Sequence, residues 1–425
     1  MSTATIAHRV PVQLTLEHIE PFIQKEAGRV SGRYGNIRLG SGFQPIFSLA
    51  HRRAVGYEAL LRPQAADGSP LSPLAVFGMA QDEAESVFLD RLCRVIHVLN
   101  FMAQADDVSW LFLNVDPRVT VYGKHHGTFF TEMLKRHQIA PHRVVVEILE
   151  GQIQDESLLV DAAEYYKELG CLVAIDDFGA GHSNFERIWR IKPHIVKLDR
   201  SIITQAVADR TVRRIVPNLV NLVHEAGSMV LMEGIETEEE AMIALDSDID
   251  FVQGYYFARP SSILPSNTQA SNSMDELCAR FKRANKIITT RNKNELHAYL
   301  DAFQVFLKQF KTGAGAIDAC QGFLDLPRAE RCYLLDKNGS QLGKSFISAG
   351  ATSHADPRFN PLSDSSDATW SRRHYFRRAI SQPGEIQASR PYLSLTGGNM
   401  CVTLSVAVFS KKEMVVLCGD LKWSD

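Results

Sequence analysis

The sequence predicts an α/β protein, a modified TIM (β/α)₈ barrel with one antiparallel strand, followed by a smaller α+β domain. Eight short runs rich in Val, Ile, Leu and aromatic residues recur before residue 258, as in strands buried on both faces. Helical segments such as 83–103 and 155–169 separate most of them, which is the order of elements in such a barrel. The runs are 43–49, 56–62, 110–116, 144–150, 172–178, 194–200, 229–235 and 251–257.

The first connection determines the direction of the first two strands. Only AHRRAV lies between Leu49 and Gly56, whereas a parallel crossover takes about a dozen residues or more. We therefore expect an antiparallel hairpin, which leaves the barrel with one reversed strand. The alternative is an open doubly wound sheet, which would need glycine-rich phosphate loops that the sequence lacks.

The composition changes after Pro260. The polar stretch SSILPSNTQASNS fits a linker, and 274–311 has helical spacing, with a break near 289–294 left open. Beyond it we expect a strand and an Asn338-Gly339 turn, a helix at 370–380, and late antiparallel strands. The expected domains are 1–262, a barrel with its core at 40–262; 263–311, a linker and helical spacer; and 312–425, the smaller domain.

Charge and cysteine content narrow the class of protein. A net charge of −3 offers no general surface for polyanions, so we expect no DNA partner. Seven scattered cysteines without a CxxC argue against a disulfide framework or a zinc site, and fit a reducing compartment. No run approaches 18 apolar residues, and the first residues lack the apolar core of a signal peptide. We therefore expect a cytoplasmic protein with no membrane partner.

Polar residues interrupt or end most of the predicted strands. In (β/α)₈ barrels the active site lies at the C-terminal ends of the strands, so these side chains should meet at one rim. Clustered charges need compensation when buried, and oxygen ligands without Cys or His suit Mg²⁺ or Mn²⁺ better than zinc. By themselves, Asp176 and Asp177 fit either a cation between adjacent carboxylates or a strand-end cap. The residues are Glu58, Asn114, Glu147, Asp176, Asp177, Lys197 and Glu233.

Seven motifs in order resemble one bacterial family. GYEALLRP, with Glu58-Ala59-Leu60 at its centre, is similar to the signature of the EAL domain, the cyclic di-GMP phosphodiesterase module. FLNVDP, VEILE, AIDDFGAGHSNF, IVKLDRSII, LMEGIE and QGYYFARP follow, so the resemblance covers about residues 40–262. It implies the reversed-strand barrel and the hydrolysis of one phosphodiester of cyclic di-GMP to linear pGpG in second-messenger signalling.

The resemblance also implies two Mg²⁺ or Mn²⁺ ions. The implied metal ligands are Glu58, Asn114, Glu147, Asp176, Asp177 and Glu233. The first four hold one ion, and Asp176 bridges to the second, which the last two also hold. Lys197 would lie beside the attacking water, so Lys197, Glu58 and Glu233 are the expected catalytic residues. The alternative for Lys197 is a strand-end ion pair. Calcium, which prefers looser coordination, is expected to inhibit.

Other positions match substrate contacts in the family. Arg62 suits a phosphate, because a guanidinium can bond two oxygens at once. Glu236 has an alternative role as a cap for the helix at TEEEAM. Glu150 resembles the anchor of the loop after Asp177, which shapes the second metal site and often a dimer contact. The implied substrate-binding residues are Gln44, Arg62, Asp199, Glu236 and Gln253.

A few positions depart from the family's pattern. The family usually has Thr at Leu149, Ser at Asp116 and Asn184, Tyr or Phe at His182, and Asp at His194. None of these is an implied metal ligand. These departures therefore concern the ordering of the loop after Asp177 and the rate of hydrolysis more than the chemistry of the reaction.

The tail resembles a PAS-like or Cache-like sensor domain. WSRRHYF, SRPYLSL and a late Val-rich strand carry this resemblance, which implies a regulatory or dimerising domain and hence a homodimer. Arg372 or Arg373 and Tyr392 would line a pocket for a small ligand of unknown identity. The alternative is that RRHYFRR is a solvated basic helix face, packed by Tyr375 and Phe376.

Three functions remain open on these residues. An active phosphodiesterase is favoured because every implied metal position holds a competent residue. A cyclic di-GMP receptor without turnover is the first alternative, because the loop is atypical. A barrel phosphoesterase with another phosphate substrate is the second, because a fold alone does not determine the substrate.

Overall fold

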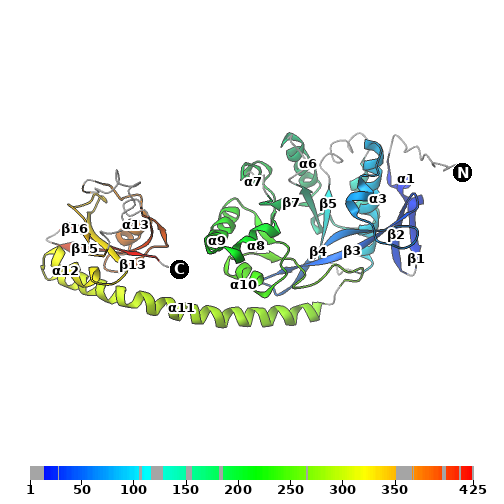
Figure 1. The fold of residues 1–425 in the computed structure, drawn as a ribbon. Helices are drawn as coiled ribbons and strands as arrows, with labels where there is room; N and C mark the ends of the chain where they lie inside the picture. Colours follow the sequence, from blue (N-terminus) through cyan, green and yellow to red (C-terminus); the bar gives the residue numbers. More distant parts are fainter. Residues whose placement is uncertain are drawn as a thin grey trace. The chain divides into compact units, whose positions relative to one another are not determined.

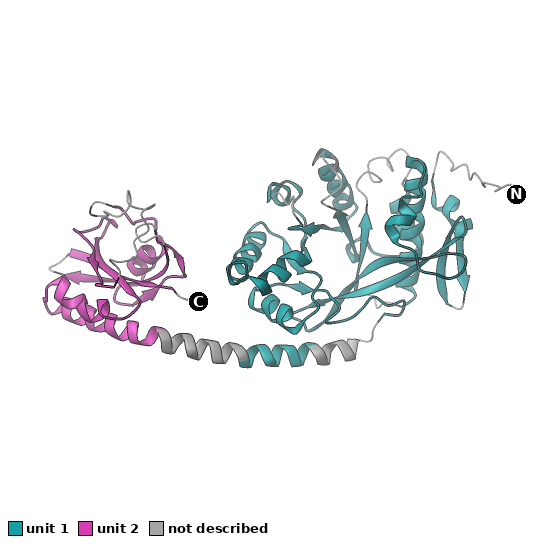
Figure 2. Ribbon diagram, viewed as in Figure 1, with its two compact units in different colours: residues 1–283 teal, residues 284–425 magenta. Residues whose placement is uncertain are grey.

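The computed structural model divides the chain into two compact units, residues 1–283 and 284–425 (Figure 2). It describes residues 14–26, 28–104, 108–115, 128–149, 156–180, 185–264, 267–350, 366, 368–394, 399–410 and 413–423. No helix among these residues is both long enough and apolar enough to cross a membrane.

Eight strands close into a barrel in the first unit (Figure 1), as the sequence predicts. Around the barrel the order is β3-β10-β9-β8-β7-β6-β5-β4, and β4 returns to pair with β3. The strands are β3 (Ile37–Ser48), β4 (Arg53–Gln64), β5 (Trp110–Val115), β6 (Val144–Leu149), β7 (Leu172–Phe178), β8 (Ile195–Leu198), β9 (Met229–Met232) and β10 (Phe251–Val252).

The reversed strand is β3. It pairs antiparallel with both β4 and β10, whereas all other neighbouring barrel strands are parallel. The turn into β4 is short, and Arg52 in it has a φ of 55°, a left-handed conformation typical of tight turns. The short first connection therefore predicts the strand direction correctly.

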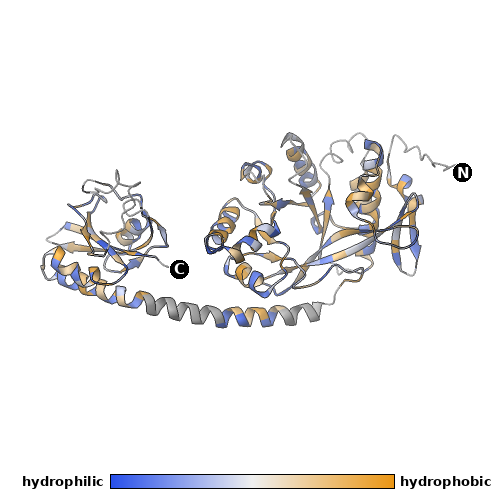
Figure 3. Ribbon diagram, in the orientation of Figure 1, coloured by the Kyte–Doolittle hydropathy of each residue, from blue (hydrophilic) through white to orange (hydrophobic). Residues whose placement is uncertain are grey.

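Helices cover the outside of the barrel (Figure 1). The longest, α3, buries 14 side chains, and Figure 3 shows hydrophobic residues along it. The main core lies between the helices and the strands, and a second apolar layer fills the barrel interior. The helices of this unit are α1 (Leu16–Ile19), α2 (Pro73–Phe77), α3 (Glu83–Met102), α5 (Phe129–Arg136), α6 (Glu156–Glu168), α7 (Phe185–Ile191), α8 (Arg200–Ala208), α9 (Arg210–Glu225) and α10 (Glu238–Asp246), with 3₁₀ turns η1 (Glu20–Phe22) and η3 (Pro141–Arg143).

Two strands before the barrel are absent from the sequence-based prediction. β1 (Ile23–Glu26) and β2 (Arg29–Tyr34) form a hairpin that extends the sheet from β3. Their sequences, IQKE and RVSGRY, lack an apolar run, and β2 instead gains stability by packing on α3. A Cβ on Gly32 would lie 3.1 Å from the Leu92 side chain, so this glycine permits close packing.

The second unit is an antiparallel sheet with helices. Its strands follow the order β12-β11-β16-β15-β13, with β14 also paired to β15. α11 (Asn267–Lys311) is one continuous helix without the break left open at 289–294; Met274 and Leu277 are buried in the first unit's core, and Phe303 and Phe306 in the second's. The remaining elements are α12 (Ala316–Leu324), α13 (His374–Ser381), β11 (Ala329–Asp336), β12 (Phe346–Ile347), β13 (Gln387–Ala388), β14 (Tyr392–Leu393), β15 (Met400–Ser410) and β16 (Glu413–Lys422).

Candidate active site

The predicted site residues lie directly above the apolar layer inside the barrel. On each of six parallel strands, a buried apolar residue of that layer is followed two positions later by a polar one, which lies in the strand or, for Glu233 and Gln253, directly after its end. Because side chains alternate faces along a strand, both members of each pair face the barrel interior. The pairs are Phe112 and Asn114, Val145 and Glu147, Ala174 and Asp176, Ile195 and Lys197, Leu231 and Glu233, and Phe251 and Gln253.

Lys197 lies at the centre of three carboxylates. Its Nζ is 2.5 Å from Oε1 of Glu147, 2.9 Å from Oδ1 of Asp176 and 2.5 Å from Oε1 of Glu233. The side chains of Lys197 and Glu147 are 1% and 0% exposed, so these charges compensate one another away from solvent. The structure therefore brings four of the predicted residues into direct contact.

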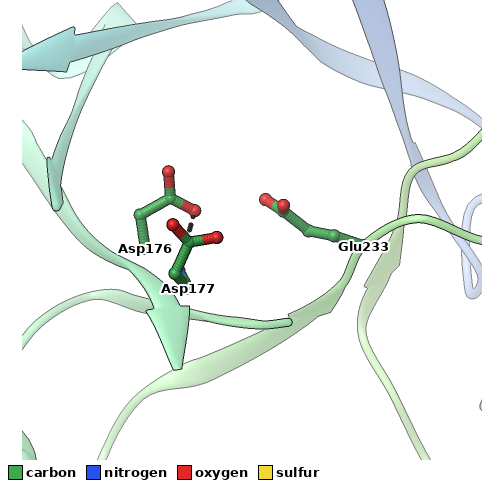
Figure 4. A group of neighbouring side chains, drawn as sticks. All are labelled: Asp176, Asp177 and Glu233. Carbon is green, nitrogen blue, oxygen red and sulfur yellow. Dashed lines mark hydrogen bonds between the residues drawn. The ribbon is translucent and has the colours of Figure 1, made fainter. Parts of the chain in front are cut away.

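Asp176, Asp177 and Glu233 form a group whose carboxylate oxygens lie within 4.8 Å of one another (Figure 4). Asp177 has a φ of 57°, a left-handed conformation that is uncommon for a residue other than glycine. Its backbone N–H donates to Oδ1 of Asp176 over 3.0 Å. This turn at the end of β7 brings two successive carboxylates to the same place.

Glu58 occupies the other side of the barrel mouth. Its Oε1 accepts a hydrogen bond from Nδ2 of Asn114 over 3.1 Å, and its Oε2 accepts one from Nε2 of Gln253 over 2.7 Å. Gln44 lies opposite Glu58 in the β3–β4 pairing and donates to the carbonyl of Ala258 over 3.3 Å. Two hydrogen bonds, one from β5 and one from the residue after β10, therefore hold the Glu58 carboxylate in place.

Burial and like charge raise the pKa values of Glu147, Asp177 and Glu233. Desolvation raises the pKa of Glu147 and of Glu233 well above the usual value, although Lys197 opposes it. Burial, with the neighbouring Asp176, raises the pKa of Asp177 to about 6. The pKa of Lys197 is raised well above its usual value, because the surrounding carboxylates outweigh desolvation. Additional positive charge would stabilise such a site.

The donor set fits a hard divalent cation. The ligand atoms are carboxylate and amide oxygens, which Mg²⁺ and Mn²⁺ prefer. Oε2 of Glu147 is buried and has no hydrogen-bond partner among the described residues, which is costly for a carboxylate unless a cation compensates it. Asp176, Asp177 and Glu233 provide a second set of converging oxygens.

The remaining predicted substrate residues have different surroundings. Arg62 lies further along β4 and donates to the carbonyl of Leu61 over 3.0 Å. Asp199 caps α8 by accepting from the Ser201 N–H over 2.9 Å. Glu236 forms a two-pronged ion pair with Arg200, while Thr237, not Glu236, caps α10. The charge of Asp199 is among the causes that raise the pKa of Asp177, whereas the Glu236 carboxylate is paired with Arg200.

Several predicted residues fall where the structure gives no side-chain description. Glu150, His182 and Asn184 lie outside the described residues, as does Asp116. Leu149 is the last residue of β6, and its side chain is likewise not described. In the second unit, Arg372 is exposed, whereas the guanidinium of Arg373 lies 5.4 Å from the ring centre of Tyr392.

Two glycines support the site in a way that the sequence analysis missed. A Cβ on Gly254 would lie 2.0 Å from the carbonyl oxygen of Ile235, so only glycine lets the segment after Gln253 pack on the turn after Glu233. Gly234 has a φ of 66°, and a Cβ there would lie 2.6 Å from Cβ of Arg200. The sequence does contain a signal for both glycines, because Gly234 directly follows Glu233 and Gly254 directly follows Gln253.

Comparisons with known proteins identify a matching family and proteins of similar sequence and fold. The EAL domain profile matches residues 34–260. The chain is 25% identical over 401 residues to the uncharacterised EAL-domain containing protein YkuI of Bacillus subtilis strain 168, covering 90% of this chain and 94% of YkuI. The crystal structure of YkuI with c-di-GMP, its substrate, and calcium superposes with a TM-score of 0.72 at 23% identity, over 91% of this chain and 97% of that one.

A second relative matches about half of the chain. Cyclic di-GMP phosphodiesterase PdeF of Escherichia coli strain K12 is 27% identical over 225 residues. The match covers 52% of this chain and 30% of PdeF.

Proposed function

Because this chain belongs to the EAL domain family, we propose that it hydrolyses one phosphodiester bond of cyclic di-GMP to give linear pGpG. The observation that carries the proposal is the cluster at one end of the barrel, where Lys197 contacts Glu147, Asp176 and Glu233 and where Asn114 bonds to Glu58. The name of PdeF and the ligand of YkuI support the choice of substrate.

The residues present would hold two Mg²⁺ or Mn²⁺ ions. We assign Glu58, Asn114, Glu147 and Asp176 to one ion, and Asp176, Asp177 and Glu233 to the other. When bound, such a pair of cations makes a water more acidic and neutralises charge on the attacking and leaving oxygens.

The chain's own groups then bind and orient the reactants. Lys197, held by three carboxylates, remains protonated and can donate a hydrogen bond to the water or to a phosphoryl oxygen. Glu58 and Glu233 are the carboxylates that we place at the reacting centre with Lys197. In the reaction, the oxygen of water bonds to phosphorus and the bond to the 3′ oxygen breaks, with one proton passing to the leaving oxygen.

Residues further from this centre would bind the substrate. Gln44 and Gln253 flank Glu58, and Arg62 lies higher on the same strand, so these three support the proposed contacts. For Asp199 and Glu236 the proposal requires that their present bonds to Ser201 and Arg200 be shared with, or replaced by, the ligand. Glu150 remains the proposed anchor of the loop after Asp177.

One assay separates the candidate functions. The purified chain is incubated with cyclic di-GMP and Mg²⁺ or Mn²⁺, and the nucleotides are separated over time. Conversion to pGpG supports the phosphodiesterase. Binding without conversion supports the receptor. If the chain neither binds nor converts cyclic di-GMP, the phosphodiesterase and the receptor are both rejected, and a phosphoesterase with another phosphate substrate is the remaining candidate.

We further propose that residues 312–425, which lie within the second unit, form a PAS-like or Cache-like regulatory domain of a cytoplasmic homodimer, and that residues 263–311 are the helical spacer that precedes it. Its similarity to YkuI along nearly the whole chain supports the presence of the same tail, but not its role. Light scattering of the full chain tests the dimer. Comparing turnover of the full chain and of residues 1–283 tests the regulation.

A further inference from the structure

A pocket opens beside the barrel mouth where β2 diverges from β3. The β2–β3 pairing ends at Leu39, and an isolated bridge joins Phe43 to Ser261. Between them, the outer edge of β3 at residues 40–42 has no partner strand among the described residues, and the pocket lies at this gap. It has a volume of about 420 Å³, within the range of small-molecule sites.

Arg62 reaches this pocket because of a glycine. Arg62 lies on β4, opposite Gly40 of β3, and its side chain passes over Gly42. A Cβ on Gly42 would lie 3.1 Å from Nε of Arg62, closer than ordinary contacts allow. The absence of side chains at residues 40 and 42 therefore leaves room for the guanidinium across β3.

The pocket is strongly basic. Arg29, Arg38 and Arg62 all line it, and no Asp or Glu is among the described residues that line it. Glu26 lies 3.8 Å from Arg38, but both side chains are more than half exposed, so this ion pair is weak and Arg38 can still bind an anion. Residues 1–265 carry nine more acidic than basic side chains, so this basic pocket lies in an otherwise acidic part of the chain. Such a pocket fits an anion, and guanidinium groups bind phosphate oxygens in pairs.

The pocket is one dinucleotide length from the carboxylate cluster. Arg62 is four residues beyond Glu58 on β4, which corresponds to about 13 Å along the strand. Both side chains lie on the same face of the strand, so the path between them follows the inner face of the barrel wall. Two linked nucleotides can span this distance.

We propose that Arg29 and Arg38, together with Arg62, bind the guanylate of the dinucleotide that is not being cleaved, through its phosphate. This inference rests on the proposed function, because the dinucleotide must be the ligand of the barrel. It adds Arg29 and Arg38, on the hairpin before the barrel, to the substrate-binding residues. It also explains why β2 presents Arg29 and Ser31 toward the pocket beside Gly40 and Gly42.

The test uses Arg29→Gln, Arg38→Gln and the double variant in the full chain. Each single change should raise KM for cyclic di-GMP by about three- to tenfold and leave kcat nearly unchanged. The reason is that it removes one exposed charge-assisted contact that stabilises the bound substrate and the transition state equally. The rise should shrink at high salt. Arg53→Gln is the matched control and should leave KM unchanged, because Arg53 begins β4, at the end of that strand far from Arg62.

A binding measurement separates this inference from the proposed function. The affinity for cyclic di-GMP is measured with calcium, under which turnover is not expected. Normal hydrolysis with unchanged KM and unchanged affinity in the double variant overturns the subsite and leaves the phosphodiesterase intact. Weakened binding in a chain that does not hydrolyse supports the subsite and rejects the enzyme. Failure of the wild-type chain to bind overturns both.

Inorganic phosphate provides the last comparison. Competition by phosphate that disappears in the double variant, without a change in KM for the dinucleotide, identifies a general anion site and overturns the assignment to the substrate. Loss of phosphate competition together with a raised KM supports it.

Discussion

The ammonium group of Lys197 lies 2.5 Å from Oε1 of Glu147, and both side chains are almost completely buried. Two further carboxylates contact the same ammonium group. Lys197 is therefore both a proposed catalytic residue and the counter-charge that allows the acidic centre to be buried.

Replacement of Lys197 by Met should destabilise the metal-free protein. Removal of one partner of a buried ion pair typically costs about 3–5 kcal/mol, because the other charge is left uncompensated. The loss of folding stability should grow as the pH rises above 4.5, the usual pKa of a glutamate in the unfolded chain. Glu147 and Glu233 have raised pKa values in the folded protein, so above this pH they still hold protons that the unfolded chain has released, which favours unfolding. Urea unfolding in EDTA at pH 5 and pH 8 measures this.

Divalent cations should return part of the stability lost in this variant, since they supply the missing positive charge. Turnover should stay low even with metal present. An unfolding free energy equal to that of the wild-type chain at both pH values would contradict the view that Lys197 compensates the acids.

Replacement of Glu58 by Ala should abolish turnover. Glu58 is the proposed ligand that Asn114 and Gln253 hold in place, and Ala removes both of its oxygens. A loss of at least about a hundredfold in kcat is expected for a group acting at the reacting centre. Glu239→Ala, which breaks only an exposed pair with Arg213, is the control and should be near wild type. An unchanged rate in Glu58→Ala would refute the metal assignment.

Calcium should fail to support turnover and should compete with Mg²⁺ or Mn²⁺. It takes more ligands at longer distances than Mg²⁺, so two calcium ions would not hold the reacting groups as tightly. Initial rates are compared with each ion alone and with calcium added to Mn²⁺. Equal rates with calcium and Mg²⁺ would count against a tight two-metal site.

The layered barrel interior explains how much of the fold and site could be predicted. Buried strands appear in the sequence as apolar runs, and a polar residue two positions after an apolar one marks the mouth of the barrel. Lys197 and Glu233 follow this rule after Ile195 and Leu231. The short link before Arg53 predicts the reversed strand for an equally local reason.

Long-range and weakly patterned features could not be predicted in the same way. The contact of Gln253 with Glu58 joins residues 195 positions apart. The strand β2 has no apolar run, so it is specified by the surface it packs on and not by its own sequence. The ion pair of Glu236 with Arg200 depends on how the first residue of α8 lies beside the loop before α10, which no local pattern encodes.

Gly254→Ala should lower both activity and stability. Its Cβ would lie 2.0 Å from a backbone carbonyl oxygen that has no room to move, so the segments that carry Gln253 and Glu233 must separate. We expect a fall in melting temperature and a larger fall in kcat. Gly322→Ala, in α12, has no atom within 4 Å of the new Cβ and should be neutral or slightly stabilising. Wild-type activity in Gly254→Ala would show that this close contact does not position the site.

In the second unit, Asp420→Asn should be strongly destabilising, because Asp420 is 1% exposed and is the counter-charge of Arg331. Its Oδ2 accepts from Nε of Arg331 over 2.7 Å, and its Oδ1 accepts from the Thr403 hydroxyl over 2.7 Å. Loss of the negative charge leaves a largely buried guanidinium uncompensated, at a cost of about 3–5 kcal/mol. Thermal and urea unfolding measure the loss, with the exposed Asp301→Asn as control.

The double change Arg331→Met with Asp420→Leu should recover much of the stability, since it removes both charges. A double variant no more stable than Asp420→Asn would show that the hydrogen bonds to Thr403 and its neighbours, and not the charge pair, hold this sheet together.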